Sequence, residues 1–131
     1  MNILIIEDIE FRQELIKSKL EKLNFTLVDC ANTAEKATEL LKEKKYDIVF
    51  FDHDLVGHKT GSHITKQWFE ERENYQTKSP IIFIHSMNIA GADVMENYLK
   101  GFCKSIDRIP FKFIATGETD LQKRIEEMLK N

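Results

Sequence analysis

Apolar residues in this chain fall into two patterns that alternate from one end to the other. In one pattern they are nearly consecutive, which is typical of strands buried in a parallel sheet. In the other they recur every three or four positions among charged residues, which is typical of helices that pack on a core by one face. The sequence therefore predicts alternating strands and helices.

The predicted strands cover residues 3–6, 25–30, 47–51, 80–85 and 105–109. The fifth is the weakest, because it is partly charged and Pro110, directly after it, lacks a backbone donor. The predicted helices cover residues 11–23, 34–41, 62–74, 90–100 and 121–129. Asn32 or Thr33 is positioned to cap the second helix, and Thr116 to cap the last.

Strands separated by helices pair in parallel through right-handed crossovers. We therefore expect an α/β fold, a single doubly wound, flavodoxin-like domain over residues 1–131. Five parallel strands in the order 2-1-3-4-5 would carry helices on both faces. Ligands bind at the carboxyl ends of the strands in such sheets, so the residues that follow each strand are the candidates for function.

The composition narrows the function classes. The chain is 42% hydrophobic and 31% charged, as in an ordinary soluble domain, and its net charge of −3 offers no basis for broad DNA binding. Cys30 and Cys103 are too few for a disulfide framework and lack metal-ligand spacing, which favours a cytoplasmic protein with reduced thiols. No apolar stretch has the length of a signal peptide or membrane segment.

Carboxylates follow the first and third predicted strands. Glu7 and Asp8 end the first, and Asp52 and Asp54 end the third, which is its neighbour in the expected order. Several ionised carboxylates in one small pocket repel each other unless a cation joins them. Hard oxygen ligands favour Mg²⁺ (or Mn²⁺), which usually shares its shell with a phosphate. The alternative is that these residues only cap strands and solvate loops.

Polar residues also follow the fourth strand, at the same edge. His85 is a candidate general acid or base, and Ser86 and Asn88 are candidate phosphate-binding groups. Asn88 is also positioned to cap the next helix, whose free N–H groups would favour an anion. In the structural alternative, His85 is a buried histidine whose ring nitrogens have hydrogen-bond partners, and Asn88 is only a helix cap.

His53 lies between two of the carboxylates and is a candidate contact for a phosphate or substrate. Side chains alternate direction along a strand, however, so His53 would face away from a pocket that Asp52 faces. The five-residue steps from His53 to His58 and His63 match no familiar zinc-ligand spacing.

These residues resemble the receiver domain of bacterial response regulators over essentially the whole chain. The matching features are Glu7-Asp8, Asp52, Gly61 and Pro80. The resemblance implies that Glu7 and Asp8 help to hold Mg²⁺ and that Asp52 accepts a phosphoryl group. It also implies that Asp54 contributes its backbone carbonyl.

Two departures from that family are evident. His85 stands where the family has a switch Ser or Thr, and Ile109 stands where it has a Lys before a Pro. Losing that lysine removes a cation that pairs with the phosphoryl group.

With these departures, the chain is similar to a variant of the family called the cyclic-phosphate-processing receiver domain. The motifs that carry this second resemblance are Asp52-His53-Asp54-Leu55 with Gly57 and Gly61, and His85-Ser86-x-Asn88 with Gly91-Ala92 and Met95. The resemblance implies the handling of cyclic phosphates, either RNA 2′,3′-cyclic ends or cyclic nucleotides.

Three functions follow as hypotheses. The first is a metal-dependent phosphoesterase that acts on a cyclic-phosphate nucleotide or RNA end. The second is a stand-alone receiver that a histidine kinase phosphorylates on Asp52. The third is a non-catalytic interaction module, which predicts no magnesium affinity.

Overall fold

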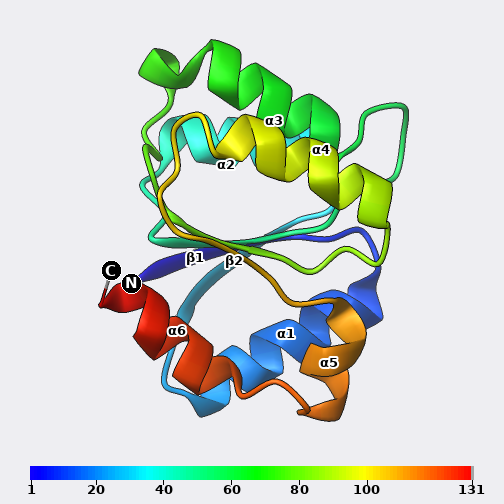
Figure 1. Ribbon diagram of the computed structural model, residues 1–131, viewed down its shortest axis with the longest axis vertical. Coiled ribbons are helices and arrows are strands. Elements are labelled where there is room, and N and C mark those ends of the chain that lie inside the picture. The colour runs from blue at the N-terminus through cyan, green and yellow to red at the C-terminus, as the bar shows by residue number, and fades with distance from the viewer. Residues whose placement is uncertain (131) are drawn as a thin grey trace.

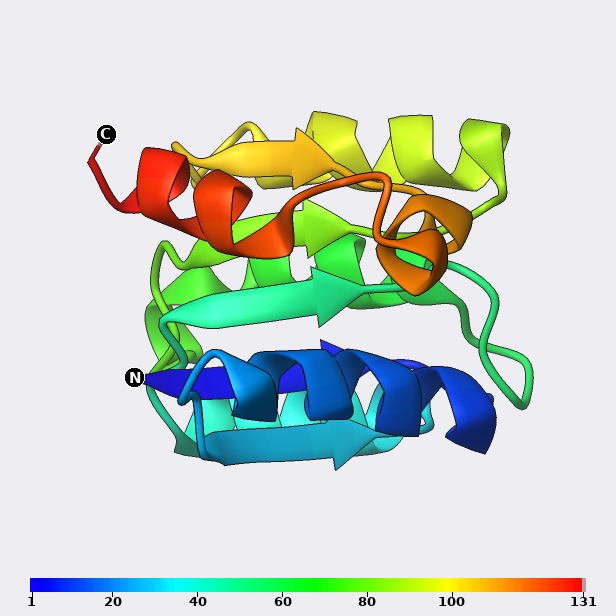
Figure 2. The same ribbon diagram turned by 90° about the horizontal axis from the view of Figure 1, so that it is seen from below.

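Five parallel strands form one sheet in a computed structural model that describes residues 1–130 (Figure 1). The spatial order is β2-β1-β3-β4-β5, which confirms the order and the flavodoxin-like architecture expected from the sequence. The strands are β1 (Asn2–Ile6), β2 (Leu27–Ala31), β3 (Ile48–Phe51), β4 (Ile81–Ile84) and β5 (Ile106–Arg108). Figure 2 shows them running in one direction, so their carboxyl ends share one edge.

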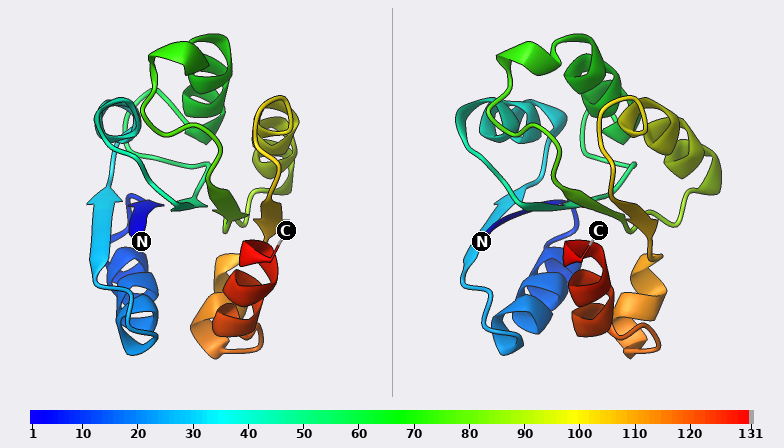
Figure 3. Two further views of the ribbon diagram at one scale, coloured as in Figure 1. Left: turned by 90° about the vertical axis from the view of Figure 1, so that its left-hand side faces the viewer. Right: turned by 60° about the vertical axis from the view of Figure 1, so that its left-hand side comes forward.

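Helices cover both faces of the sheet, as Figure 3 shows. One layer contains α2 (Ala34–Glu43), α3 (Gly61–Glu70) and α4 (Ile89–Leu99), with the short 3-10 turn η1 (Arg72–Asn74) after α3. The opposite layer contains α1 (Glu10–Lys22), α5 (Phe111–Thr116) and α6 (Leu121–Leu129). None of the helices in the described part of the chain has the length and apolar character needed to cross a membrane.

The central strands are buried on both faces because helices lie above and below them. In β3, Val49 and Phe51 belong to the apolar cluster under α2, α3 and α4. Ile48 and Phe50 belong to the cluster under α1, α5 and α6. This alternation also decides which way the residues after each strand point.

The helix caps agree with the sequence in one place and differ in another. The Thr33 side chain accepts the Lys36 N–H at 3.1 Å, so the expected cap of α2 is confirmed. The expectation that Thr116 caps the last helix is wrong, because Thr116 ends the separate helix α5. The chain then turns at Gly117, whose φ is 77°, and Asp120 caps α6.

Candidate functional site

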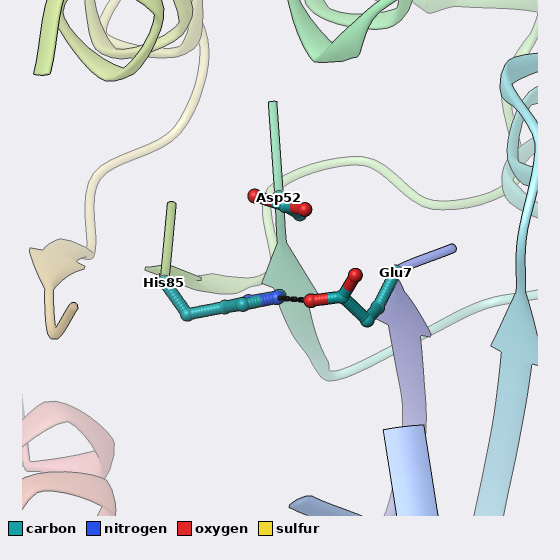
Figure 4. Close-up of side chains that lie close together, drawn as sticks. All are labelled: Glu7, Asp52 and His85. Atoms are coloured by element: carbon teal, nitrogen blue, oxygen red, sulfur yellow. Dashed lines mark hydrogen bonds and ion pairs between the residues drawn. The ribbon is translucent and has the colours of Figure 1, made fainter. Parts of the chain in front are cut away.

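Glu7, Asp52 and His85 lie side by side because each directly follows the last residue of a neighbouring strand. The register pairs Ile6 with Phe51, and Phe51 with the last residue of β4. The ladder continues one step further, since the Asp52 N–H donates to the Ile6 carbonyl and the His85 N–H to the Phe51 carbonyl, each at 3.0 Å. One possible ligand atom from each side chain lies within 4.8 Å of the others (Figure 4). We call these three residues the strand-end cluster.

A buried ion pair forms the base of this cluster. His85 Nε2 lies 3.0 Å from Glu7 Oε1, and both side chains are fully buried. The Ile9 N–H donates to Glu7 Oε2 at 3.1 Å. Burial alone would raise the pKa of Glu7, but the hydrogen bond and the positive charge of His85 hold that pKa below its ordinary value. Glu7 is therefore ionised, and His85 balances its charge.

Asp52 is the least enclosed member of the cluster, although it is only 4% exposed. Its Oδ1 accepts the His53 N–H at 2.9 Å. Burial raises the pKa of Asp52 to about 6; the charge of Glu7 adds to the rise and that of His85 opposes it. Without a cation, ionisation of the buried Asp52 carboxyl group therefore costs free energy.

Asp8 extends the negative charge around the cluster. It is half-buried, and its pKa is raised by burial and by the hydrogen bond and charge of Glu7. Three neighbouring carboxyl groups, two of them with raised pKa values, offer the hard oxygen atoms that a divalent cation such as Mg²⁺ prefers. A cation would stabilise the ionised form that burial, and to a lesser extent the charge of Glu7, disfavours, so the residues fit one.

His85 retains one polar atom that this arrangement leaves free. Within residues 1–130, its Nδ1 is buried without a hydrogen-bond partner. Buried polar atoms are rarely left unpaired in proteins, and those that are often lie at functional sites. The direct contact between His85 and Glu7 could not be read from the sequence, because 78 positions separate them.

His53 points to the opposite layer of helices, as alternation along the strand predicts. Its Nδ1 lies 2.9 Å from Asp54 Oδ1, and its Nε2 lies 2.8 Å from Ser62 Oγ. The hydrogen bond from His53, and a second from Asn88, lower the pKa of Asp54. The Asp54 carboxylate therefore lies with His53 rather than with Glu7 and Asp52. We call Asp54, His53 and Ser62 the loop triad.

Ser86 and Asn88 shape the start of α4. The Asn88 N–H donates to Ser86 Oγ at 3.0 Å, and Asn88 Oδ1 accepts the Gly91 N–H at 2.9 Å, so the expected cap is confirmed. Gly91 has no room for a side chain, because a Cβ there would lie 2.4 Å from His53 Cγ. Gly61 is equally confined, since its Cβ would lie 2.5 Å from the Asp52 carbonyl oxygen.

The position that carries lysine in receivers is apolar and closed. Ile109 is 1% exposed and packs in the core beside α5. Arg108 is bound to Asp93 at 2.6 Å, and the Lys112 ammonium lies 5.1 Å from the Phe113 ring centroid. Both cations thus have partners outside the strand-end cluster.

Among the sequence candidates, the structure brings together Glu7, Asp52 and His85, with Asp8 beside them. It places His53 and Asp54 in a second group together with Ser62, which sequence reasoning missed. No signal in the sequence links Ser62 to His53, because the loop between them has no regular period.

Comparison with known proteins points to one family and one fold. The family model of the cyclic-phosphate processing receiver domain matches residues 3–101. Over 74 residues the chain is 36% identical to the aerobic respiration control sensor protein ArcB of Escherichia coli and of Shigella flexneri. That match covers 54% of this chain but 9% of the sensor protein.

Solved structures share the fold at low identity. The response regulator TrrA of Thermotoga maritima, in complex with Mg²⁺ and BeF, has a TM-score of 0.70 and 17% identity, with 98% of this chain and 99% of that chain covered. The receiver domain of the Arabidopsis thaliana histidine kinase CKI1, complexed with Mg²⁺ and BeF₃⁻, has a TM-score of 0.72 and 15% identity, with 99% and 90% covered. A CheY-like receiver domain of Methylobacillus flagellatus has a TM-score of 0.67 and 23% identity, with 95% and 98% covered.

Proposed function

Because this chain belongs to the cyclic-phosphate processing receiver domain family, we propose that it hydrolyses cyclic phosphates of nucleotides or RNA ends. We propose that Glu7, Asp8 and Asp52 hold the Mg²⁺ or Mn²⁺ that this reaction needs. The observation that carries the proposal is the buried ion pair between Glu7 and His85 directly beside Asp52, whose pKa is raised. Such perturbed carboxyl groups at strand ends are typical of functional sites.

A divalent cation bound there would polarise a phosphoryl oxygen and offset its negative charge. Asp52 supplies the proton chemistry in this proposal. A bound cation would keep the Asp52 carboxylate ionised, and this carboxylate would then accept a proton from a water molecule as a general base.

His85 acts in this proposal as a positioning residue, because a fully buried ring touches no substrate. Its bond to Glu7 keeps that carboxylate ionised and oriented. Ser86 and Asn88, at the start of α4, are the polar groups that we place beside the phosphate. Asp54, held by His53 and Asn88, is left out of the proposed ligand set.

The first test measures turnover of nucleoside 2′,3′-cyclic phosphates and of an RNA oligonucleotide that ends in a cyclic phosphate, with Mg²⁺, with Mn²⁺ and with EDTA. We expect metal-dependent product formation that Asp52→Asn abolishes. Asp47→Asn is the matched control, because Asp47 is an exposed carboxylate at the opposite end of the same strand. Equal turnover in Asp52→Asn and the wild type would overturn the proposal.

A second function is phosphorelay signalling, in which a histidine kinase phosphorylates Asp52. It is supported by the position of Asp52 at the end of β3 and by the likeness to a sensor kinase segment. The absence of lysine at position 109 favours hydrolysis instead, because no cation is available there to hold a phosphorylated state. Acetyl phosphate with Mg²⁺ separates the two functions, since a stable acyl phosphate on Asp52 indicates a receiver. A protein that is inert in both assays and takes up no cation in calorimetry is an interaction module.

A further inference from the structure

A serine, a histidine and an aspartate meet outside the strand-end cluster, in the geometry of a nucleophile with its base. Asp54 Oδ1, His53 Nδ1, His53 Nε2 and Ser62 Oγ are joined by contacts of 2.9 and 2.8 Å. An ionised carboxylate only accepts hydrogen bonds, so His53 Nδ1 carries the proton that faces Asp54. The tautomer with its proton on Nδ1 leaves Nε2 as an acceptor for the hydroxyl hydrogen of Ser62, 2.8 Å away.

Three neighbours hold the His53 ring in this position. The Asn88 amide donates to Asp54 Oδ1 at 3.3 Å and so fixes the carboxylate that the ring faces. Gly91 lets α4 approach the ring so closely that even a methyl group would displace it. The Gly61 N–H donates to the His53 carbonyl at 2.7 Å, which sets the start of α3 and therefore Ser62. The ring is thus preorganised toward Ser62.

Ser62 borders a hollow between α3 and α4. The hollow has a volume of about 190 Å³ and is lined by Ser62, His63, Lys66, Val94 and Tyr98. Lys66 offers a positive charge one helical turn after Ser62, and Val94 and Tyr98 offer apolar surface. This combination suits a small phosphate ester, whose anionic group Lys66 can neutralise and whose organic part can contact α4.

We propose that Ser62 is a nucleophile, activated by His53 and oriented through Asp54, that accepts a phosphoryl group from a small phosphate ester seated in this hollow. The Ser62 Oγ–phosphorus bond forms as the ester P–O bond breaks. The Ser62 proton passes to His53 Nε2 and then to the departing alkoxide oxygen, so the alcohol leaves neutral. In a second step water attacks the phosphorus atom, the Oγ–phosphorus bond breaks, and inorganic phosphate leaves while Ser62 regains its hydroxyl group. This site adjoins the proposed metal site, because the His53 N–H donates to Asp52 and Asn88 serves both, but its chemistry needs no metal ion.

The test is covalent labelling by diisopropyl fluorophosphate, followed by intact mass and peptide mapping. We expect one diisopropylphosphoryl group per chain, located on Ser62, as fluoride leaves and the proton is released through His53. Ser62→Ala should remove the label, whereas Ser18→Ala, at an exposed position on α1, should not. His53→Gln should slow labelling at least about 100-fold, because the general base is lost.

Folding is controlled in two ways. Each variant is compared with the wild type by circular dichroism, and wild-type protein unfolded in urea should lose the fast reaction. Asp54→Asn provides a variant at the surface of the triad that should slow labelling while the fold persists. A label on any other serine, or equal labelling rates for folded His53→Gln and the wild type, would overturn the assignment. In that case the loop triad only ties β3 to α3.

Discussion

Replacing His85 by leucine tests how strongly the buried ion pair stabilises the fold. The substitution removes the cation that lies 3.0 Å from Glu7 and leaves that carboxylate fully buried. Its remaining partners are the Ile9 N–H and the Asp8 carboxyl group, and Asp52 adds repulsion. Breaking a buried pair in this way typically costs about 3–5 kcal/mol, because the other charge stays desolvated and unpaired.

The size of the expected shift follows from the length of the chain. Unfolding entropy scales with residue number, and for 131 residues 1 kcal/mol corresponds to roughly 3–4 °C. We therefore expect the Tm of His85→Leu to fall by about 10–20 °C. The assay is urea unfolding and thermal melting at neutral pH in the presence of EDTA. A surface pair at a similar distance, Lys44 with Asp29 at 2.9 Å, provides the matched control; there Lys44→Met should cost less than about 1 kcal/mol.

A double-mutant cycle with Glu7→Gln isolates the pair itself. The combined variant should be more stable than the sum of the two single losses predicts, with a coupling of about 2 kcal/mol. The pH dependence has a definite sign: the pKa of folded Glu7 is below its ordinary value, so its stabilisation is present above that value and is lost as the pH falls through the folded pKa. A loss below about 1 kcal/mol for His85→Leu, with additive effects in the cycle, would refute the conclusion that the pair is ionised and dry.

Other substitutions test the remaining parts of the site and fold. Asp52→Asn in EDTA should stabilise the protein near pH 7 by about 1–3 kcal/mol. Its folded pKa of about 6 lies above the ordinary 3.8, so stability is lost as the pH rises between these values; urea unfolding should show the advantage shrinking toward pH 4. Gly91→Ala should lower the free energy of unfolding by about 1–3 kcal/mol, because its methyl group would meet the His53 ring; an unchanged Tm would contradict that packing. Asp120→Ala should cost about 1 kcal/mol in urea unfolding, because its side chain accepts the Lys123 N–H at 3.1 Å; no loss would mean that the cap is dispensable.

The sheet could be predicted because its strands are apolar on both faces. Runs such as 48–51 leave few alternatives to a central parallel strand, and the helices between them require crossovers. The region after β5 could not be predicted in the same way. The helix α5 has six residues, which is too short for a helical period to show, and Gly117 interrupts the chain with a left-handed turn. Thr116 therefore looked like a cap, although its hydroxyl donates to the Lys112 carbonyl within α5.

The convergence of Glu7 and Asp52 at one edge was expected from the strand order, and the register explains why His85 joins them. That register depends on how β3 pairs with β1 and with β4, and a strand such as β3, which is apolar on both faces, has no polar–apolar alternation from which the register could be predicted. A shift of one residue would have brought Ser86 to the cluster in place of the histidine. The contact between His53 and Ser62 could not be predicted either. The irregular loop between them sets their distance, and its path does not follow from a repeating pattern in the sequence.

Alternation along the strands also explains why one short motif contributes to two separate groups. Asp52 faces the layer of α1 and α5 together with Glu7 and His85, whereas His53 faces α3 and α4 and meets Ser62. Asp52 and His53 are adjacent in sequence, yet their side chains contact different groups on opposite sides of the sheet. An ordinary receiver has a lysine directly after the fifth strand to pair with its phosphoryl group; here that position is the buried Ile109, and His85 balances Glu7 from within the core. The positive charge within this cluster therefore lies on the residue that orients Glu7, whereas an ordinary receiver carries it on a lysine that faces the phosphoryl group.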